Sequence, residues 1–405
     1  MPNFEITSKD KLAAIEFQLD WKSENAYHSD RFTAQRVNFW RDAFPSGVNE
    51  KLMNKLNGET VNLNFLPGNI VPPFSPSKEK TIKRRQFDTK FGLGNNLTPR
   101  VGRFYPKGIL RDVSGIYRAN LEPFRLVRVE NGDLEVDLNH PLAPYEVQVK
   151  AVIRDVRPKF DERGGTSNDW IEIAADGPGM QARWKNRKTD FFSDNPFSRQ
   201  DETDDSVFYS KPRFVQHLDD TAIENVSLVY GEFLKPGMKV LDLMSSWQSH
   251  IPENMQLEKV VGLGMNEEEL AANPLLSGYE TKDLNRSQIL PFDESEFDAI
   301  ICTASVEYLN RPFAVFREAA RILKSGGIFA VAFSNRWFPP KAINIWGQIH
   351  EFERVGLVME YFLESSLYDD LCTYSIRGLP RPDGDKYARQ FAFSDPVYAV
   401  VAKRR

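Results

Sequence analysis

The sequence predicts an α/β protein, with a doubly wound parallel sheet in residues 206–405 preceded by a smaller, mostly β region in residues 1–157. After residue 206, short apolar runs alternate with segments of helical periodicity, which is the rhythm of a parallel sheet with crossover helices. Before residue 157, alternating apolar and polar residues separated by turn sequences indicate strands. Residues 158–205 are rich in Pro, Gly, Asp, Ser and Arg, so we expect a connector with one ordered patch at 170–174.

The elements of the carboxyl-terminal sheet can be placed in order. The first strand is expected at 240–243, a short apolar run of the kind that a buried parallel strand needs. The expected elements that follow are strand 259–263, helix 267–272, a short segment near Tyr279, strand 297–303, helix 312–323, turn 324–327 and strand 328–333. Two late strands, at 371–376 and 396–402, suggest an antiparallel hairpin at the edge of the sheet. Ligands of such sheets collect at the carboxyl ends of the strands.

The stretch 239–250 has the shape of a nucleotide-binding strand-to-loop turn but carries no glycine. Met244, Ser246 and Gln248 stand where small residues would normally let the backbone approach a cofactor. The hydroxyls of Ser245, Ser246 and Ser249 are small donors, so the loop is expected to admit a ligand. Trp247 has two interpretations, because its ring could cover the ligand or plug the site.

The amino-terminal region has its own signature. A strand at 124–130, an Asn131-Gly132 turn and a returning strand at 134–137 predict a hairpin, followed by a turn at 139–143 and a strand at 145–156. This order resembles the carboxyl-terminal half of SlyD-type FKBP prolyl isomerases, with 104–110 and 52–64 as further points of similarity. The resemblance covers about 45–157 and implies an α+β domain that binds polypeptide. We expect His140 to be a structural turn residue and do not expect prolyl isomerase activity.

The order of elements after residue 239 resembles that of class I S-adenosylmethionine-dependent methyltransferases. The resemblance covers about the last 190 residues, and its strongest points are the Val-Leu-Asp-Leu strand at 240–243, Asp283-Leu284 before 290–292, the Phe297-Asp298 strand start and 321–327. It implies a Rossmann-like domain with S-adenosyl-L-methionine as cofactor. Asp242 would accept a hydrogen bond from the ammonium group of the cofactor, and Asp283 one from its adenine amino group.

The resemblance also implies a set of cofactor-binding positions. At one of them, as in the loop without glycine, the chain departs from the family pattern. The implied positions are Asp242, Met244, Ser245, Ser246, Trp247, Gly264, Met265, Asn266, Asp283, Leu284 and Ser305. Gly264 stands where the family carries an acid that binds the ribose hydroxyls, a loss worth on the order of 1.5–3 kcal/mol. We expect Asn266, Glu267 or Glu268 to reach the ribose instead.

Candidate catalytic residues follow the fourth and fifth strands. Glu307 and Tyr308 would lie beside the transferred methyl group as a base or as positioning groups, although Glu307 could equally open a helix. Arg336 could clamp an acidic substrate or form a structural salt bridge. His217 and His250 are expected to be structural. Residues Tyr209 and Arg213 are expected to fold over the cofactor.

Composition narrows the classes of function. With 41% hydrophobic and 27% charged residues and a net charge of −5, the chain is typical of a soluble globular protein and not of a dedicated nucleic-acid binder. No apolar stretch approaches the roughly 20 residues that cross a bilayer, and acidic residues among the first 20 argue against a signal peptide. The two cysteines, Cys302 and Cys372, form neither a disulfide framework nor a metal site, so we expect a cytoplasmic protein without a metal.

Two functions therefore stay open at the level of sequence. The first is methyl transfer by direct displacement to an unknown small-molecule or protein substrate. The second is a catalytically degenerate methyltransferase fold that serves as a scaffold for a peptide-binding, chaperone-like amino-terminal domain. The missing glycines and the missing acid favour the scaffold, whereas Asp242, Asp283 and the polar residues at the strand ends favour the enzyme.

Overall fold

The computed structural model describes residues 5–91, 97–160 and 165–405; the remaining residues of the predicted β region and connector lie outside the described residues. The chain divides into two compact units whose segments interleave. Unit 1 comprises Met1–Asn25, Arg36–Asp194 and Ile349–Leu357, and unit 2 comprises Ala26–Gln35, Asn195–Gln348 and Val358–Arg405. From the sequence, we expected each domain to be one continuous span. Composition along a chain does not report which distant segments pack together, so it gives no sign of this interleaving.

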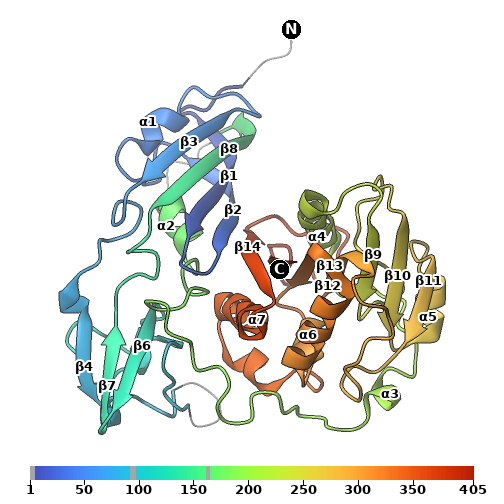
Figure 1. The fold of residues 1–405 in the computed structure, drawn as a ribbon. Helices are drawn as coiled ribbons and strands as arrows, with labels where there is room; N and C mark the ends of the chain where they lie inside the picture. Colours follow the sequence, from blue (N-terminus) through green and yellow to red (C-terminus); the bar gives the residue numbers. More distant parts are fainter. Residues whose placement is uncertain (1–4, 92–96, 161–164) are drawn as a thin grey trace. The chain divides into compact units, whose positions relative to one another are not determined.

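Unit 1 is built mainly from strands (Figure 1). The long strand β1 (Lys11–Lys22) pairs antiparallel with β8 (Val147–Pro158), and β8 pairs on its other side with β3 (Thr60–Phe65). A second sheet has the order β4–β7–β6–β5, with β4 at Glu79–Lys83, β7 at Asp133–Asp137, β6 at Pro123–Glu130 and β5 at Phe104–Pro106. The helical elements of this unit are α1 (Val48–Leu52), η1 (Pro76–Lys78), η2 (Arg84–Gln86), η3 (Lys107–Ile109) and α2 (Trp170–Ala175).

The predicted hairpin of unit 1 is confirmed as β6 and β7. Its turn residues Asn131 and Gly132 both have positive φ, 49° and 86°, as a two-residue turn between twisted strands requires. The turn that follows is tied down by Asn139, whose side chain accepts from the Ser75 amide at 2.9 Å and donates to the Ser75 carbonyl at 3.1 Å. The Nδ1 atom of His140 accepts from the Leu142 amide at 3.1 Å, and burial lowers the pKa of His140 to about 4. This turn therefore has the structural role expected of it.

Unit 2 contains the predicted parallel sheet. Its strands lie in the order β11 (Gly278–Thr281), β10 (Lys259–Gly264), β9 (Lys239–Leu243), β12 (Phe297–Thr303) and β13 (Leu323–Phe333), all parallel to their neighbours. The antiparallel strand β15 (Val397–Arg404) follows β13 and pairs in turn with β14 (Tyr368–Arg377). The α/β class and these strands agree with the prediction, except that β13 starts at Leu323 and so includes the expected turn 324–327.

The late hairpin does not end the sheet, which corrects the expectation that it forms the edge. Strand β2 (Tyr27–Asn38) from the amino-terminal part of the chain pairs parallel with β14, with Tyr27 opposite Cys372 and Phe32 opposite Arg377. The hydroxyl of Thr373 lies 2.7 Å from a ring nitrogen of the fully buried His28. An exposed strand edge offers unpaired amide and carbonyl groups, and β2 satisfies them. The pairing joins residues some 345 positions apart, which no local pattern reports.

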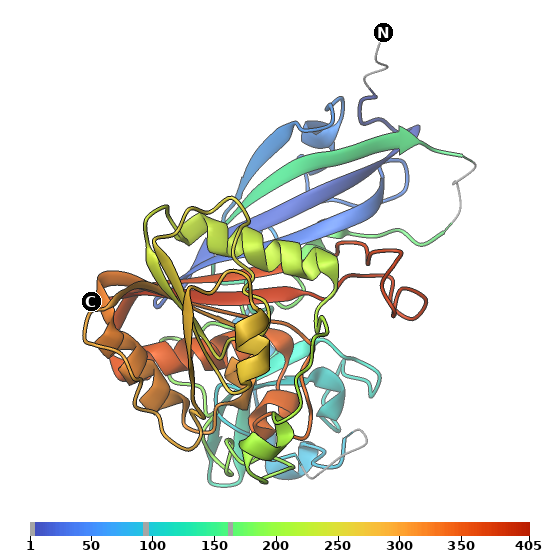
Figure 2. The same cartoon turned by 90° about the vertical axis from the view of Figure 1, so that its right-hand side faces the viewer.

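Helices cover both faces of the sheet in unit 2 (Figures 1 and 2). On one face, α4 (Asp220–Phe233) packs Val226 and Tyr230 into a core with Ala330 and Ala332 of β13. On the other face, Phe329 of β13 meets Phe316 of α6 (Pro312–Ile322) and Phe362 of α7 (Glu351–Ser365), with ring centroids 4.9 and 5.3 Å apart. The remaining helical elements are α3 (Asp205–Phe208), α5 (Glu267–Ala272), η4 (Val306–Tyr308) and η5 (Asn344–Gln348). In the part of the chain that the structure describes, no helix is long and apolar enough to cross a membrane.

Candidate functional site

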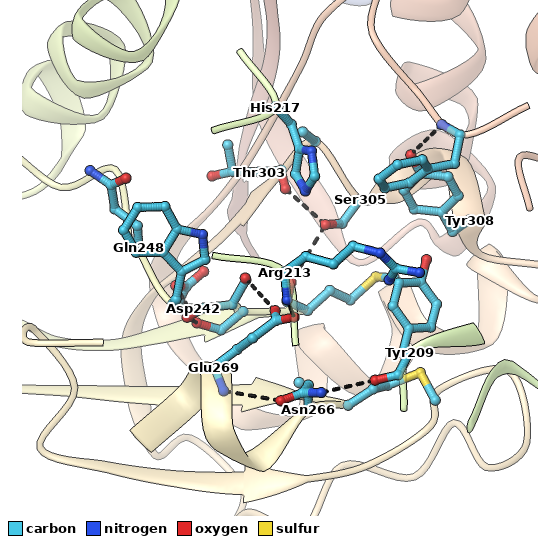
Figure 3. A pocket seen from close by; sticks show the side chains of 18 of the residues that line it. Tyr209, Arg213, His217, Asp242, Gln248, Asn266, Glu269, Thr303, Ser305 and Tyr308 are labelled. Carbon is cyan, nitrogen blue, oxygen red and sulfur yellow. Dashed lines mark hydrogen bonds between the residues drawn. The ribbon is translucent and has the colours of Figure 1, made fainter. Parts of the chain in front are cut away.

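A cavity opens in unit 2 at the carboxyl ends of β9, β10 and β12 (Figure 3). Its floor is the loop after β9, residues 244–250, which we call the floor loop. Its roof is residues 205–217, which we call the roof segment and which contributes Asp205, Tyr209, Arg213 and His217 to the lining. All eleven cofactor-binding positions predicted from sequence lie in this lining.

Asp242 is the charged group at the base of the cavity. Its side chain is 4% exposed, and its Oδ2 atom accepts from the hydroxyls of Ser245 at 2.6 Å and Ser249 at 2.5 Å. Burial raises the pKa of Asp242 to about 6, because removing a carboxylate from water disfavours its charged form, and the two hydroxyls oppose that rise. The carboxylate is therefore mostly ionised at neutral pH and can attract a cationic group of a ligand.

The floor loop replaces glycine with a set of side-chain hydrogen bonds. Met244 has a φ of 58°, a left-handed conformation that costs a non-glycine residue roughly 1–2 kcal/mol. The amide of Asn273 donates to the Ser246 carbonyl at 2.9 Å and to the Ser249 hydroxyl at 3.0 Å. The Ser246 hydroxyl donates to Glu269 at 2.6 Å. These bonds fix a loop that lines the cavity, with the Trp247 ring 6.3 Å from the ring of Phe214.

Gly264 ends β10 under the floor loop, and the geometry explains why no acid stands there. A Cβ atom at this position would lie 2.2 Å from the carbonyl oxygen of Ser245, closer than real atoms approach. The floor loop backbone thus occupies the space that a side chain at position 264 would need. The course of the floor loop therefore requires a glycine at position 264.

The residues expected to bind the ribose in place of the missing acid lie in different places relative to the cavity. Asn266 caps α5, accepting from the Glu269 amide at 3.0 Å, and donates to the Tyr209 carbonyl at 3.0 Å. Glu269 lines the cavity, whereas Glu267 and Glu268 lie outside the lining. Asp283 also lines it, and its Oδ1 atom accepts from the amide of Asn285 at 2.8 Å. Sequence analysis missed Glu269 because three consecutive glutamates leave open which one a helix turns inward.

The roof segment is held by a cluster of buried charges. Lys341 is fully buried, with its ammonium group 3.2 Å from the Asp205 carboxylate and 2.6 Å from the Thr203 carbonyl. Arg199 donates to both carboxylate oxygens of Asp205, at 2.8 and 2.7 Å, and the amide of Asn285 adds a third donor at 2.9 Å. Asp205 is thus fixed at the point where the roof segment begins to cover the cavity.

Tyr209 and Arg213 occupy the roof as the sequence predicted. The Arg213 guanidinium lies 4.4 Å from the centre of the Phe208 ring and 5.6 Å from that of Phe338. Its Nη2 atom donates to the Phe208 carbonyl at 2.8 Å, and its backbone amide donates to Glu269 at 2.7 Å. Stacking on aromatic faces and this backbone bond hold a cation over the cavity.

Of the three predicted catalytic residues, one lines the cavity and two lie outside its lining. Tyr308 lines the cavity, and its hydroxyl accepts from the Phe338 amide at 2.9 Å. Glu307 is fully buried and lies outside the lining, on the turn η4 that follows β12. Arg336 also lies outside it, with its guanidinium 4.4 Å from the Tyr387 ring centre and 3.9 Å from Asp395. For Arg336 the structure therefore gives the packing and salt-bridge role that was the alternative.

Both histidines for which we expected a structural role line the cavity. His250 is half-buried, and loss of solvent lowers its pKa to about 4, so its ring is neutral at physiological pH. His217 is exposed, with its ring against Phe338 at 5.1 Å between centroids. His250 ends the stretch 239–250 that the sequence marked as a cofactor turn, whereas His217 becomes part of the site only through folding. Among the described residues, no group of three or more His, Cys, Asp or Glu side chains could hold a metal ion.

Comparison with known proteins identifies the type of domain that carries this cavity. Residues 248–331 match a family model described as a methyltransferase domain. Comparison with curated protein sequences finds no match. The carboxyl-terminal part of the chain thus contains a segment that matches a methyltransferase domain.

Solved structures similar to part of this chain include several that are described as methyltransferases. They include a chain of the complex between the Haloferax volcanii Trm112 methyltransferase activator and a methyltransferase (17% identity, TM-score 0.32, covering 45% of this chain and 88% of that one). A Bacillus halodurans methyltransferase is 14% identical (TM-score 0.31, 44% and 97% covered). An S-adenosylmethionine-dependent methyltransferase from Mesorhizobium loti is 16% identical (TM-score 0.31, 46% and 99% covered).

Proposed function

We propose that this protein is an S-adenosylmethionine-dependent methyltransferase that transfers the methyl group to its acceptor by direct displacement. The observation that carries the proposal is the ionised, buried carboxylate of Asp242 at the base of a cavity that is lined in part by the matched residues 248–331. A lone buried carboxylate is costly unless it has a cationic partner. The ammonium and sulfonium groups of the cofactor would supply that partner.

The residues around Asp242 fit the cofactor. Met244, Ser245, Ser246 and Trp247 of the floor loop would lie along its amino-acid part, with Ser305 opposite them across the cavity. Met265, Asn266, Asp283 and Leu284 would surround the adenosine, and the bare backbone of Gly264 leaves room beside it. When bound, the cofactor supplies a methyl group activated by a positively charged sulfur.

The protein's own contribution would be alignment and exclusion of water. Direct displacement needs the acceptor atom in line with the breaking bond, so a closed and rigid cavity supplies much of the rate. The roof segment, held by the Lys341 cluster, covers the cavity, and the floor loop is fixed by hydrogen bonds to Asp242, Glu269 and Asn273. Both surfaces are thus preorganised before any ligand binds.

Calorimetric titration of S-adenosylmethionine and S-adenosylhomocysteine into the wild type and Asp242→Asn tests the proposal. We expect micromolar binding by the wild type and a loss of about tenfold or more in the variant, the size of one charged hydrogen bond. Asp293→Asn, which changes an exposed aspartate far from the cavity lining, is the matched control. No heat and no thermal shift at millimolar ligand in the wild type would leave the scaffold function.

The alternative proposal is a degenerate methyltransferase fold that supports a polypeptide-binding, SlyD-like domain in the amino-terminal region. The hairpin of β6 and β7 and the turn at Asn139 support that resemblance. The cavity argues against degeneracy, since Trp247 lines it without filling it. In a proline-peptide isomerisation assay we expect no acceleration, because His140 is neutral and already accepts a backbone hydrogen bond; a large acceleration would contradict this.

A further inference from the structure

One wall of the cavity is aromatic. The Tyr308 and Phe338 rings lie 6.1 Å apart at an interplanar angle of 32°, and the His217 ring meets Phe338 edge-on at 5.1 Å and 83°. All three side chains line the cavity, near the residues Thr303 and Ser305 that follow β12. Flat aromatic walls favour flat ligands, because stacked and edge-on rings gain contact area at little entropic cost. We call Tyr308, Phe338 and His217 the aromatic wall.

The carboxylates that line the cavity are already engaged within the protein. Asp205 is paired with Lys341 and Arg199, and Asp242 accepts from two serine hydroxyls. Glu269 accepts from the Ser246 hydroxyl and the Arg213 amide. Asp283 accepts from the Asn285 amide. Each of these carboxylates thus already accepts at least one hydrogen bond within the protein.

Tyr308 is also unsuited to accept a proton. Its hydroxyl already accepts from the Phe338 amide, and burial raises its pKa well above the usual range, so the phenol stays neutral. Proton acceptance at neutral pH needs a group whose pKa lies near or below the working pH. Among the titratable side chains of the lining, Asp242 and the histidines satisfy this condition, and the proposed function already assigns Asp242 to the ammonium group of the cofactor.

His217 is more accessible than His250. It is exposed, and Figure 3 shows its imidazole directed into the cavity from the roof. The charged and titratable groups that act on it are Arg213 of the roof, Glu269 of α5, Lys386 of the loop between β14 and β15, and His250 of the floor. Loss of solvent, with help from Arg213 and Lys386, lowers the pKa of His217, whereas Glu269 opposes the shift. The ring is therefore a neutral base at physiological pH.

We propose that the methyl acceptor is a planar aromatic molecule with a hydroxyl or amino group, which lies against the aromatic wall and gives its proton to His217. The inference rests on the proposed methyltransferase function and names its substrate class. In the step, a bond forms between the acceptor oxygen or nitrogen and the methyl carbon while the sulfur–carbon bond breaks. The breaking bond leaves its electron pair on sulfur, which becomes a neutral thioether. The acceptor proton passes to the imidazole and then to solvent.

Two probe molecules of nearly equal shape separate proton transfer from packing. We would titrate 4-nitrophenol and 4-nitrotoluene into the complex of the protein with S-adenosylhomocysteine, using the wild type, His217→Gln and Lys211→Gln. Lys211 is an exposed residue of the same roof segment outside the cavity lining, so its variant is the matched control. In a buffer more acidic than the pKa of free 4-nitrophenol, where the free probe is the colourless phenol, the visible absorbance of bound 4-nitrophenolate reports whether the protein has taken the proton.

We expect His217→Gln to weaken 4-nitrophenol binding about tenfold and to remove the phenolate absorbance, since a hydrogen bond to a charged group is lost. Affinities for 4-nitrotoluene and for S-adenosylhomocysteine should stay within about twofold of the wild type, because neither molecule gives a proton to His217. With S-adenosylmethionine in place of the product, the wild type should bleach 4-nitrophenol by forming its methyl ether, and the variant should do so more slowly.

Three results would overturn the inference. The first is equal weakening of both probes by His217→Gln, which would assign the histidine to packing. The second is an unchanged phenolate signal in that variant. The third is binding of S-adenosylhomocysteine without binding of either probe. If S-adenosylhomocysteine itself fails to bind the wild type, the proposed function fails first and takes the inference with it.

Discussion

The floor loop and the roof segment enclose the same cavity but are held by different forces. Around the floor loop, Ser245 and Ser249 donate to the Asp242 carboxylate and Asn273 donates to the Ser249 hydroxyl, over separations of at most 24 residues. At the roof, Asp205 is held by the fully buried Lys341, more than 130 residues away. Breaking a buried ion pair costs about 3–5 kcal/mol, against about 1.5–3 kcal/mol for one hydrogen bond to a charged group and about 1 kcal/mol for a neutral one. The roof therefore depends on few, strong contacts and the floor on many weaker ones.

The largest effect is expected from removing the cation of the roof. Lys341→Met leaves Asp201 and Asp205 with one cation fewer in a buried cluster, and should lower the free energy of unfolding by about 3–5 kcal/mol. Lys324→Met is the matched control, because that lysine is half exposed where it pairs with Asp298, and should cost at most about 1 kcal/mol. Denaturant unfolding of both variants makes the comparison. Equal losses would mean that the buried ion pair of the roof is no stronger than an exposed one.

The second-largest effect is expected from removing the charge of Asp242 at the floor, which should raise the free energy of unfolding. The folded-state pKa of Asp242, about 6, lies above its unfolded value of 3.8, so the folded protein binds the proton more tightly. Ionisation above pH 6 therefore costs stability, on the order of 3 kcal/mol, and this cost disappears as the pH falls from 6 towards 4. Asp242→Asn cannot ionise, so it should be more stable than the wild type at neutral pH while losing cofactor affinity.

Thermal and denaturant unfolding between about pH 4 and pH 8 measures this difference. The stability advantage of the variant should shrink to nearly nothing at the acidic end. Affinity of the wild type for S-adenosylmethionine should fall over the same range as Asp242 becomes protonated. A variant less stable than the wild type at neutral pH would contradict the assignment of a strained, functional carboxylate to the floor.

The smallest effect is expected at the contact between β10 and the floor loop. Gly264→Ala places a methyl group 2.2 Å from the Ser245 carbonyl, so the loop backbone must move, at a cost of about 1–3 kcal/mol. Cofactor affinity should fall as well, since Ser245 holds Asp242. Gly278→Ala in β11 is the control, because a Cβ atom there meets nothing within 4 Å. If Gly264→Ala changed neither the stability nor the cofactor affinity, the floor loop would be more pliable than its hydrogen bonds indicate.

The strands that carry the cavity were predictable because their signal is local. β9, β10 and β12 are short apolar runs, and a parallel sheet places the polar residues after them at one edge. That is why Asp242 and Ser305 were predicted to lie at one site. Glu307 and Arg336 were also predicted there, but turn geometry directs Glu307 into the core and Arg336 toward Tyr387. The direction of a side chain in a turn depends on dihedral angles that its neighbours in sequence do not determine.

The sequence alone determined the α/β class, the order of strands from β9 to β13, and a carboxylate at the end of the first of them. These features follow from periodicity and turn chemistry over a few residues, which act before any distant contact forms. Only the tertiary structure decided that β2 extends the sheet, that Lys341 anchors the roof, and that His217 faces the cavity. Each of these joins segments far apart in the chain, where the gain comes from burying charge or pairing a free strand edge.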